Sequence, residues 1–279
     1  MIVERRRPAN KFDSPGHNES DSHPAKKSLG QNFLIDDNIS RKIVGALSVS
    51  HDDFVIEIGP GRGALTRLLA MTGCKTTGVE KDRHLAQNLR SELTALANVE
   101  IVTGDFLEYA LPEVPRGLKV VGNIPYNLTA RIVSRLVDLR ERIDSAVLMV
   151  QNEVAARLSA RPGTKEYGAL SIRLQLVSEV ERLFVVTPSC FRPRPRVDSR
   201  VVRIVFRNKT PLGNEDAFVK FVKGAFGMRR KMFRNFVAAS YGKDSVELVQ
   251  EKFRTRRVET FTPAEIYDIF ATLEKDVRP

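Results

Sequence analysis

The feature that most constrains the fold of this chain is a short apolar run that ends in a glycine-rich turn. Phe54-Val55-Ile56-Glu57-Ile58 has the composition of a buried strand, and Gly59-Pro60-Gly61-Arg62-Gly63 follows it directly. Apolar residues then recur at helical spacing from residue 64 to residue 69. Strand, glycine turn and helix open a nucleotide-binding βαβ unit, because glycines permit positive φ and let a ligand approach bare backbone. The spacing Gly-x-Gly-x-Gly differs from that of dinucleotide sites, so the turn alone is a weak signal.

Two further apolar runs lead into a carboxylate. The run at residues 76–79 is followed by Glu80, and the run at residues 99–102 leads to Asp105. An acidic side chain at the end of a second strand can accept from both hydroxyls of a ribose, and Asp105 could accept from an adenine amine. One carboxylate at such a place is commonly a helix cap. Two carboxylates on successive strands favour a cofactor crevice.

A fourth apolar run, at residues 118–122, ends at Asn123-Ile124-Pro125-Tyr126, which combines an amide, a carbonyl before proline and an aromatic ring. The exocyclic amine of a nucleobase is a poor nucleophile, so catalysis at such an amine depends on positioning. The Asn123 side-chain oxygen and the Ile124 carbonyl, which proline holds outward, can accept its two N–H groups. Tyr126 can stack on the extruded base. An ordinary turn at the end of a strand is the alternative interpretation, and these residues alone leave both open.

The charge of the chain favours a polyanionic partner. The formal charge is +11, from 45 Lys and Arg against 34 Asp and Glu, which favours RNA or DNA. A solvated basic surface without a partner would carry the same charge. The positions of the arginines favour a nucleic acid, because six of them crowd residues 192–207 against Asp198 alone, and a second basic stretch lies at residues 229–234.

The pattern of polar and apolar residues divides the chain into three regions. Residues 1–25 are polar and rich in proline, so we expect a disordered arm. Residues 26–208 form one α/β domain, with helices expected at 37–47, 128–139 and 153–160 and strands at 146–150, 183–186 and 201–206. The link between the last two strands is too short for a helical crossover, so we expect them to run antiparallel. Residues 209–279 contain helical spacing only, including a capping box at Thr262-Pro263-Ala264-Glu265.

Several classes of protein are disfavoured. No apolar run approaches membrane-spanning length, and no secretory signal follows the first residues. Cys74 and Cys190 are the only cysteines, which favours a reducing, cytoplasmic setting. The four histidines are scattered without metal-ligand spacing, so we expect no metal. We expect a monomer.

Taken in order, six segments resemble the KsgA family of small-subunit ribosomal RNA adenine dimethyltransferases. The segments lie at residues 31–34, 57–66, 123–127, 151–158, 167–171 and 191–199. The resemblance runs from about residue 26 to residue 206 and is looser beyond. It implies an S-adenosylmethionine-dependent enzyme with a Rossmann-like seven-stranded methyltransferase sheet. The helical spacing and the positive charge of residues 209–279 predict a small C-terminal helical domain that binds RNA. The implied reaction places two methyl groups on each of two adjacent adenines in a hairpin loop of small-subunit rRNA, during maturation of that subunit.

The resemblance also implies site residues. Those that would contact the cofactor are Asn32, Leu34, Gly59, Glu80, Asp105 and Asn123. Asn123 and Tyr126 stand where the family handles the target base, and both are the predicted catalytic residues. The chain departs from the family in its long polar arm and in Asn152, where many relatives have lysine.

Three alternatives stay open. The related Erm-type methyltransferases modify one adenine of large-subunit rRNA and share the glycine turn and the Asn-x-Pro-Tyr unit. The segments at 167–171 and 191–199 favour KsgA over Erm. A non-catalytic nucleic-acid-binding relative is the second alternative, although an intact Asn123-Ile124-Pro125-Tyr126 argues against it. A nicotinamide-dependent oxidoreductase is the third, disfavoured by the glycine spacing.

Overall fold

A computed structural model describes residues 31–114, 117–207 and 214–277. Its centre is a seven-stranded sheet with the order β4-β3-β2-β5-β6-β9-β7. The strands are β2 (Phe54–Ile58), β3 (Lys75–Glu80), β4 (Val99–Thr103), β5 (Leu118–Asn123), β6 (Ile143–Gln151), β7 (Ser178–Val186) and β9 (Ser199–Phe206). The predicted α/β fold with a seven-stranded sheet is therefore confirmed.

Strand directions bring several strand ends to one edge of the sheet. β4, β3, β2, β5 and β6 run parallel, and β9 runs antiparallel to both β6 and β7. The antiparallel pairing of β9 with β7 was predicted. Ile58 at the end of β2 pairs with Val79 on one side and Gly122 on the other. Glu80 pairs with Thr103 at the end of β4. The carboxyl ends of these four strands consequently lie side by side.

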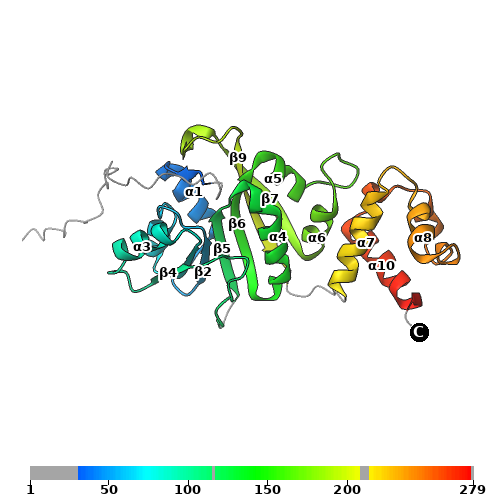
Figure 1. Cartoon of the computed structure of the whole chain (residues 1–279), viewed down its shortest axis with the longest axis horizontal. Coiled ribbons are helices and arrows are strands. Elements are labelled where there is room, and N and C mark those ends of the chain that lie inside the picture. Colours follow the sequence, from blue (N-terminus) through cyan, green and yellow to red (C-terminus); the bar gives the residue numbers. More distant parts are fainter. Residues whose placement is uncertain (1–30, 115–116, 208–213, 278–279) are drawn as a thin grey trace, which may run out of the picture.

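Helices flank the sheet and form a group at one end of the molecule. Figure 1 shows α7, α8 and α10 gathered beside α6, with α3 and β4 at the opposite end. The helices are α1 (Asp37–Leu47), α2 (Thr66–Thr72), α3 (Arg83–Glu92), α4 (Thr129–Asp138), α5 (Asn152–Leu158), α6 (Ala169–Val177), α7 (Glu215–Gly227), α8 (Phe233–Tyr241), α9 (Glu251–Arg254) and α10 (Pro263–Val277). No helix in the three described stretches is long and apolar enough to cross a membrane.

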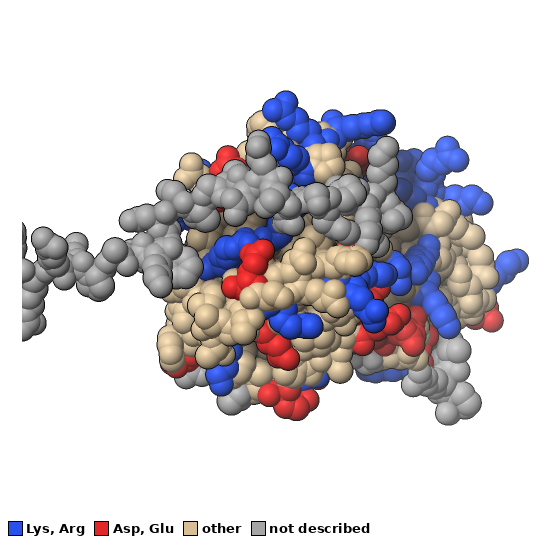
Figure 2. All heavy atoms as spheres, turned by 60° about the vertical axis from the view of Figure 1, so that its left-hand side comes forward, with Lys and Arg blue, Asp and Glu red and all other residues tan. Residues whose placement is uncertain are grey.

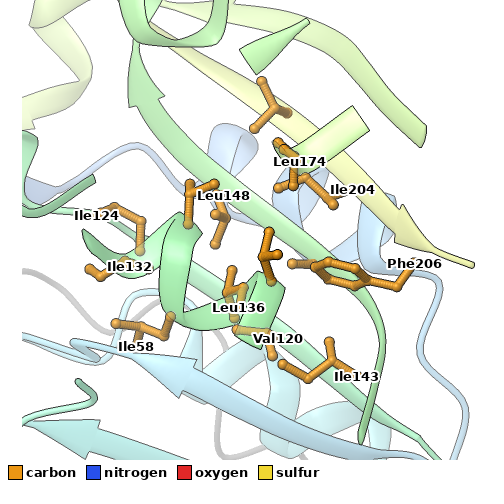
Figure 3. Packing of buried hydrophobic residues seen from close by; sticks show 14 of the residues in the cluster. Ile58, Val120, Ile124, Ile132, Leu136, Ile143, Leu148, Leu174, Ile204 and Phe206 are labelled. Carbon is orange, nitrogen blue, oxygen red and sulfur yellow. The ribbon is translucent and has the colours of Figure 1, made fainter. Parts of the chain in front are cut away.

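Both faces of the central strands are buried. Val55 and Val121 belong to the apolar cluster that includes side chains of α1 and α2. Their neighbours Ile56 and Val120 point to the opposite face and join a cluster with α4 and α6, where Figure 3 shows Leu136 of α4 close to Val120. Burial on both faces explains why these strands read as near-continuous apolar runs in the sequence.

The C-terminal helices enclose a second core that is rich in phenylalanine. The Phe221 and Phe236 rings lie 5.3 Å apart in an edge-to-face arrangement. Tyr167 donates a 2.8 Å hydrogen bond to the Phe261 carbonyl, and Ile172 of α6 belongs to the same cluster. Tyr167 and Ile172 both precede the predicted domain boundary at residue 208. The core of the C-terminal helices therefore includes residues from before this boundary, and the predicted division of the chain stays a proposal.

Most predicted element boundaries lie within a few residues of the observed ones, but α3 was not predicted, and further differences occur in the C-terminal half of the sheet domain and at β1. β7 begins at Ser178, five residues before the predicted start, and α6 was not predicted. Two short strands, β1 (Phe33–Leu34) and β8 (Phe191–Arg192), form a separate antiparallel pair that was not predicted either. The predicted arm at residues 1–25 lies outside the described residues.

Candidate active site

The strand ends that meet at one edge of the sheet border a cavity. Polar groups in its wall come from Asn32, Glu80, Lys81, Asp105 and Asn123, and apolar ones from Phe33, Val79, Phe106 and Ile132. Of the site residues predicted from the sequence, those that line the cavity are Asn32, Gly59, Glu80, Asp105, Asn123 and Tyr126. The structure therefore brings six of the seven predicted residues to one place.

The glycine turn supplies bare backbone to the cavity. Gly59 and Gly61 have φ angles of 65° and 57°, which side chains rarely adopt. A Cβ at Gly59 would meet no atom within 4 Å, whereas a Cβ at Gly61 would lie 3.2 Å from the Phe33 ring. The space beside Gly59 is thus open, and a ligand can approach its backbone. Above the turn, the Arg62 guanidinium lies 4.8 Å from the centre of the Phe33 ring.

Glu80 links the glycine turn to the end of β3. Its carboxylate accepts a 2.9 Å hydrogen bond from the N–H of Gly61 and a 2.8 Å bond from the N–H of Asp82. Burial raises the pKa of Glu80 above its usual value, although the backbone donors Asp82 and Gly61 partly offset this effect. A carboxylate has about four acceptor sites, so Glu80 can hold the turn in place and still accept from a ligand.

Asp105 follows β4 and is paired with a lysine. Its Oδ1 accepts from the N–H of Leu107 at 3.0 Å, and its Oδ2 accepts from Lys81 Nζ at 2.8 Å. Burial opposes ionisation of Asp105, but the bonds from Lys81 and Leu107 outweigh burial and hold its pKa below the usual value. Each of the two carboxylates therefore both stabilises a turn and lines the cavity. Lys81 was not identified from the sequence, because a single lysine after a strand carries no motif.

Asn123 ends β5 with its side-chain amide in a defined orientation. Nδ2 donates a 2.8 Å hydrogen bond to the carbonyl of Asn32. Within the described part of the chain, Oδ1 of Asn123 accepts no hydrogen bond. The amide nitrogen is therefore engaged with the protein, and the oxygen is the group left to accept from a ligand.

Ile124 is fixed by its side chain and by its backbone. The N–H donates a 3.0 Å hydrogen bond to the carbonyl of Met149, and the side chain packs beside Ile132 in the core (Figure 3). Only 1% of Ile124 is exposed, and the residue forms part of the cavity wall. Pro125, with φ −54° and ψ 129°, keeps the chain extended before a 3-10 turn at Tyr126–Leu128.

Tyr126 lines the cavity with a half-buried ring whose hydroxyl is occupied. The hydroxyl shares a 2.7 Å hydrogen bond with Oγ of Ser199. Burial raises the pKa of Tyr126 above its usual value, although the Ser199 bond partly offsets this effect. The phenol is therefore neutral at physiological pH. Ser199 was singled out in the sequence only as the end of a family segment, since 73 residues separate it from Tyr126.

Leu34 stands apart from the other predicted site residues. It is 7% exposed and packs in the apolar cluster beneath α1, and it does not belong to the cavity wall. A contact between its side chain and a cofactor stays a prediction. Among the described residues, no three His, Cys, Asp or Glu side chains are grouped so that they could hold a metal ion.

Comparison with known proteins assigns the family. A family model described as ribosomal RNA adenine dimethylase matches residues 22–275. The chain belongs to this family. A "Ribosomal RNA small subunit methyltransferase A" from Prosthecochloris aestuarii is 45% identical over 251 residues, which cover 89% of this chain and 94% of the relative. Its counterpart from Chlorobium phaeobacteroides is 42% identical over 256 residues, covering 91% and 94%.

Two solved structures share the fold of this chain. A dimethyladenosine transferase from Plasmodium falciparum superposes with a TM-score of 0.80 at 22% identity and covers 87% of this chain and 98% of its own. The 23S rRNA methyltransferase ErmE superposes with a TM-score of 0.69 at 28% identity, covering 87% and 100%. The family that the motifs indicated is confirmed, and with it an enzyme of the methyltransferase class.

Proposed function

We propose that this dimethylase uses S-adenosylmethionine to place two methyl groups on each of two adjacent adenines in a hairpin loop of small-subunit rRNA. The observation that carries the proposal is the orientation of Asn123, whose Nδ2 is bound to Asn32 while Oδ1 accepts nothing among the described residues. An amide oxygen held in this way, next to the Ile124 carbonyl and the Tyr126 ring, suits the recognition of an adenine amine.

The walls of the cavity fit S-adenosylmethionine by their chemistry. Backbone at Gly59 is open to a ligand, Glu80 retains acceptor capacity for ribose hydroxyls, and Asp105 retains it for an adenine amine. The apolar side chains of Val79 and Phe106 suit the faces of an adenine ring. When bound, the cofactor supplies an electrophilic methyl group. Asn32, Gly59, Glu80, Asp105 and Asn123 are therefore the proposed cofactor-binding residues.

The protein residues act on the target base by positioning. In the proposed arrangement, Asn123 Oδ1 and the Ile124 carbonyl accept the two N–H groups of the adenine amine and direct its lone pair toward the cofactor side of the cavity. The Tyr126 ring stacks on the base. The Tyr126 phenol is neutral and already bonded to Ser199, so it is not a general base. The nitrogen becomes acidic once it has received the methyl group, and its extra proton then passes to water without a protein base.

We propose small-subunit rRNA, and not large-subunit rRNA, as the substrate. The relatives at 42% and 45% identity carry a small-subunit name, whereas the Erm-type structure is 28% identical. A basic surface supports an RNA partner, and Figure 2 shows Lys and Arg side chains along the upper and right-hand parts of one face. Arg194 and Arg196 are exposed in the 191–199 segment. We also propose that the protein is a monomer, that it lies in the cytoplasm and that it acts on small subunits during their assembly.

Methyl transfer to isolated ribosomal subunits tests this function. The full chain is incubated with labelled S-adenosylmethionine and with unmethylated small or large subunits in separate reactions. We expect up to four methyl groups per small subunit and none on large subunits. Label on large subunits would favour the Erm-type activity. Absence of transfer to either subunit, with RNA binding retained, would favour a non-catalytic relative.

A further inference from the structure

No residue of the segment at residues 191–199 belongs to the cavity wall, yet the segment contacts the site through both of its ends. We propose that this segment positions the base-handling residues, and that Ser199 is the positioning residue that fixes the ring of Tyr126. The inference rests on the proposed function, because it concerns a ring that is proposed to stack on the target base. The inference assigns a structural role to the motif at residues 191–199.

The contact between Tyr126 and Ser199 joins a turn to the centre of the sheet. Tyr126 begins a 3-10 turn of three residues that has no side-chain cap, so little local structure holds the ring. Ser199 is 0% exposed, begins β9, and pairs with Gln151 of β6 on one side and Val186 of β7 on the other. Its Oγ lies 2.7 Å from the Tyr126 hydroxyl. A hydroxyl held between two strands cannot follow a moving ring, so this bond limits the ring to one orientation.

The other end of the segment reaches Asn123 through β1. Leu34 of β1 pairs with Phe191 of β8, and the N–H of Ile35 donates a 2.9 Å hydrogen bond to the carbonyl of Cys190. Asn32, directly before β1, accepts from Asn123 Nδ2 at 2.8 Å. One segment therefore supports the backbone that orients Asn123 and supplies the hydroxyl that anchors Tyr126.

Both ends of the segment are anchored in the core, and its middle is exposed. Phe191 is 1% exposed, whereas Val197 is 46% exposed. Near the second end, the carbonyl of Asp198 accepts a 3.0 Å hydrogen bond from the N–H of Asn152. The two contacts with the site thus arise from the fixed ends, and this arrangement suits a role in holding geometry.

A positioning role predicts a specific kinetic effect. Loss of the bond leaves the ring in place but free to reorient, so the fraction of complexes with a correctly stacked base falls. We expect the saturating single-turnover rate of Ser199→Ala to fall roughly threefold to tenfold, as the loss of one neutral hydrogen bond allows. The KM for small subunits and the Kd for S-adenosylmethionine should stay within about twofold of wild type, because neither depends on the ring orientation to the same degree.

A double-mutant cycle tests the pairing of the two groups. Ser199→Ala, Tyr126→Phe and the double variant are compared in single-turnover transfer to small subunits, with cofactor affinity measured by calorimetry. If both residues act through one bond, the double variant should be no slower than the slower single variant. Ser199→Thr, which keeps a hydroxyl, should recover most of the wild-type rate. If Ser199→Thr unfolds at a lower temperature than Ser199→Ala, the extra methyl group has disturbed the site. The double-mutant cycle then tests the pairing without this variant.

A second buried serine of the same sheet provides the control. Ser178 at the start of β7 is 1% exposed and donates a 2.7 Å hydrogen bond to the Leu174 carbonyl. Ser178→Ala should lower thermal stability by an amount similar to Ser199→Ala but leave the transfer rate unchanged. A wild-type rate for Ser199→Ala, or multiplicative losses in the double variant, would overturn the inference. Wild-type protein that transfers no methyl group would instead refute the proposed function.

Discussion

At the scale of single residues, the polar groups of the site both stabilise local structure and line the cavity. Glu80 receives two backbone N–H bonds and lines the cavity. Asn123 uses the Nδ2 of its amide to bind the Asn32 carbonyl, and its Oδ1 is the group proposed to accept from a ligand. The sequence alone supported two interpretations of these residues: that they stabilise a turn or cap a helix, or that they contact a ligand. The structure indicates that the interpretations are compatible, because the local bonds use only part of each group's capacity.

A substitution at Glu80 tests the proposed ribose contact. Glu80→Gln keeps the shape of the side chain but removes its charge and places an amide donor against backbone N–H groups. Hydrogen bonds to charged groups contribute about 1.5–3 kcal/mol, so we expect the Kd for S-adenosylmethionine to rise roughly tenfold to hundredfold. Calorimetry on the folded variant measures this, with exposed Glu100→Gln on β4 as the matched control. Equal affinities of the two variants would remove Glu80 from the proposed site.

Glu57 predicts a pH dependence of stability. Burial raises the pKa of Glu57 from 4.5 to about 7, and the nearby charge of Glu80 contributes in the same direction. The unfolded chain loses this proton at lower pH than the folded chain, so stability falls as pH rises between these two values. At about 1.4 kcal/mol per pH unit, the total loss is up to about 3 kcal/mol.

Replacement of Glu57 isolates this effect from other titrating groups. Glu57→Gln does not titrate, so its free energy of unfolding relative to wild type should increase between pH 5 and pH 8. Urea unfolding of both proteins at the two pH values gives the difference, and any constant cost of the buried amide cancels. Parallel pH dependences would contradict the assigned burial effect.

At the scale of helices and strands, the elements predicted correctly were those that the local sequence marks most strongly. β2 with its glycine turn, α1 and the capping box of α10 were all predicted, because periodicity, glycine or cap residues mark them directly. α6 was not predicted, since Ile172 packs in the core of the C-terminal helices while Leu174 packs against the sheet. A helix buried on opposite sides has no single apolar stripe.

The remaining differences also have physical reasons. β1 and β8 contain two residues each, too few to show any alternation. The first half of β7 exposes Glu179 and Glu181 at the edge of the sheet, so only its apolar second half was predicted. The bond from Tyr126 to Ser199 depends on the strand order, which sets two residues far apart in sequence side by side. Local patterns contain no information on such a contact.

The capping box of α10 supplies a prediction at this scale. Glu265 N–H donates to Thr262 Oγ1 at 3.2 Å, and Thr262 N–H donates to the Glu265 carboxylate at 2.8 Å. Thr262→Ala should lower the free energy of unfolding by about 1 kcal/mol, the usual cost of a lost cap. Thr272→Ala, an exposed site within the same helix, should change stability by less than about 0.5 kcal/mol. Equal effects in denaturant unfolding would mean that the cap contributes no specific stability.

At the scale of the whole molecule, the two cores are joined and the charges are spread across both. Tyr167 and Ile172 are buried against the C-terminal helices, so deletion of residues 209–279 would expose apolar surface on the remaining domain. Charge substitutions are therefore the better test of RNA binding by the C-terminal part. Lys231, just before α8, and Arg234, in its first turn, are both exposed, and their replacement leaves the core intact.

The double variant Lys231→Gln/Arg234→Gln should bind small subunits more weakly without loss of cofactor affinity. Each phosphate contact contributes about 0.7–0.9 to the slope of log affinity against log salt, so the slope should become shallower by about 1.5 if both residues contact phosphate. Lys75→Gln/Arg83→Gln removes the same charge at the opposite end of the molecule, from exposed positions in β3 and α3. Identical salt slopes for the two variants would place the RNA elsewhere.

The most direct test of the account is nucleotide-resolution mapping of methyl groups on small-subunit rRNA after reaction with wild-type protein and with Asn123→Ala. We expect wild type to produce dimethyladenine at two adjacent positions of one hairpin loop. The Asn123→Ala variant should modify the same positions roughly 10²–10³ times more slowly, as the loss of one preorganised polar group in a transition state does, while still binding the cofactor. Methylation at other nucleotides, or an Asn123→Ala rate equal to wild type, would contradict the proposed positioning of the adenine amine.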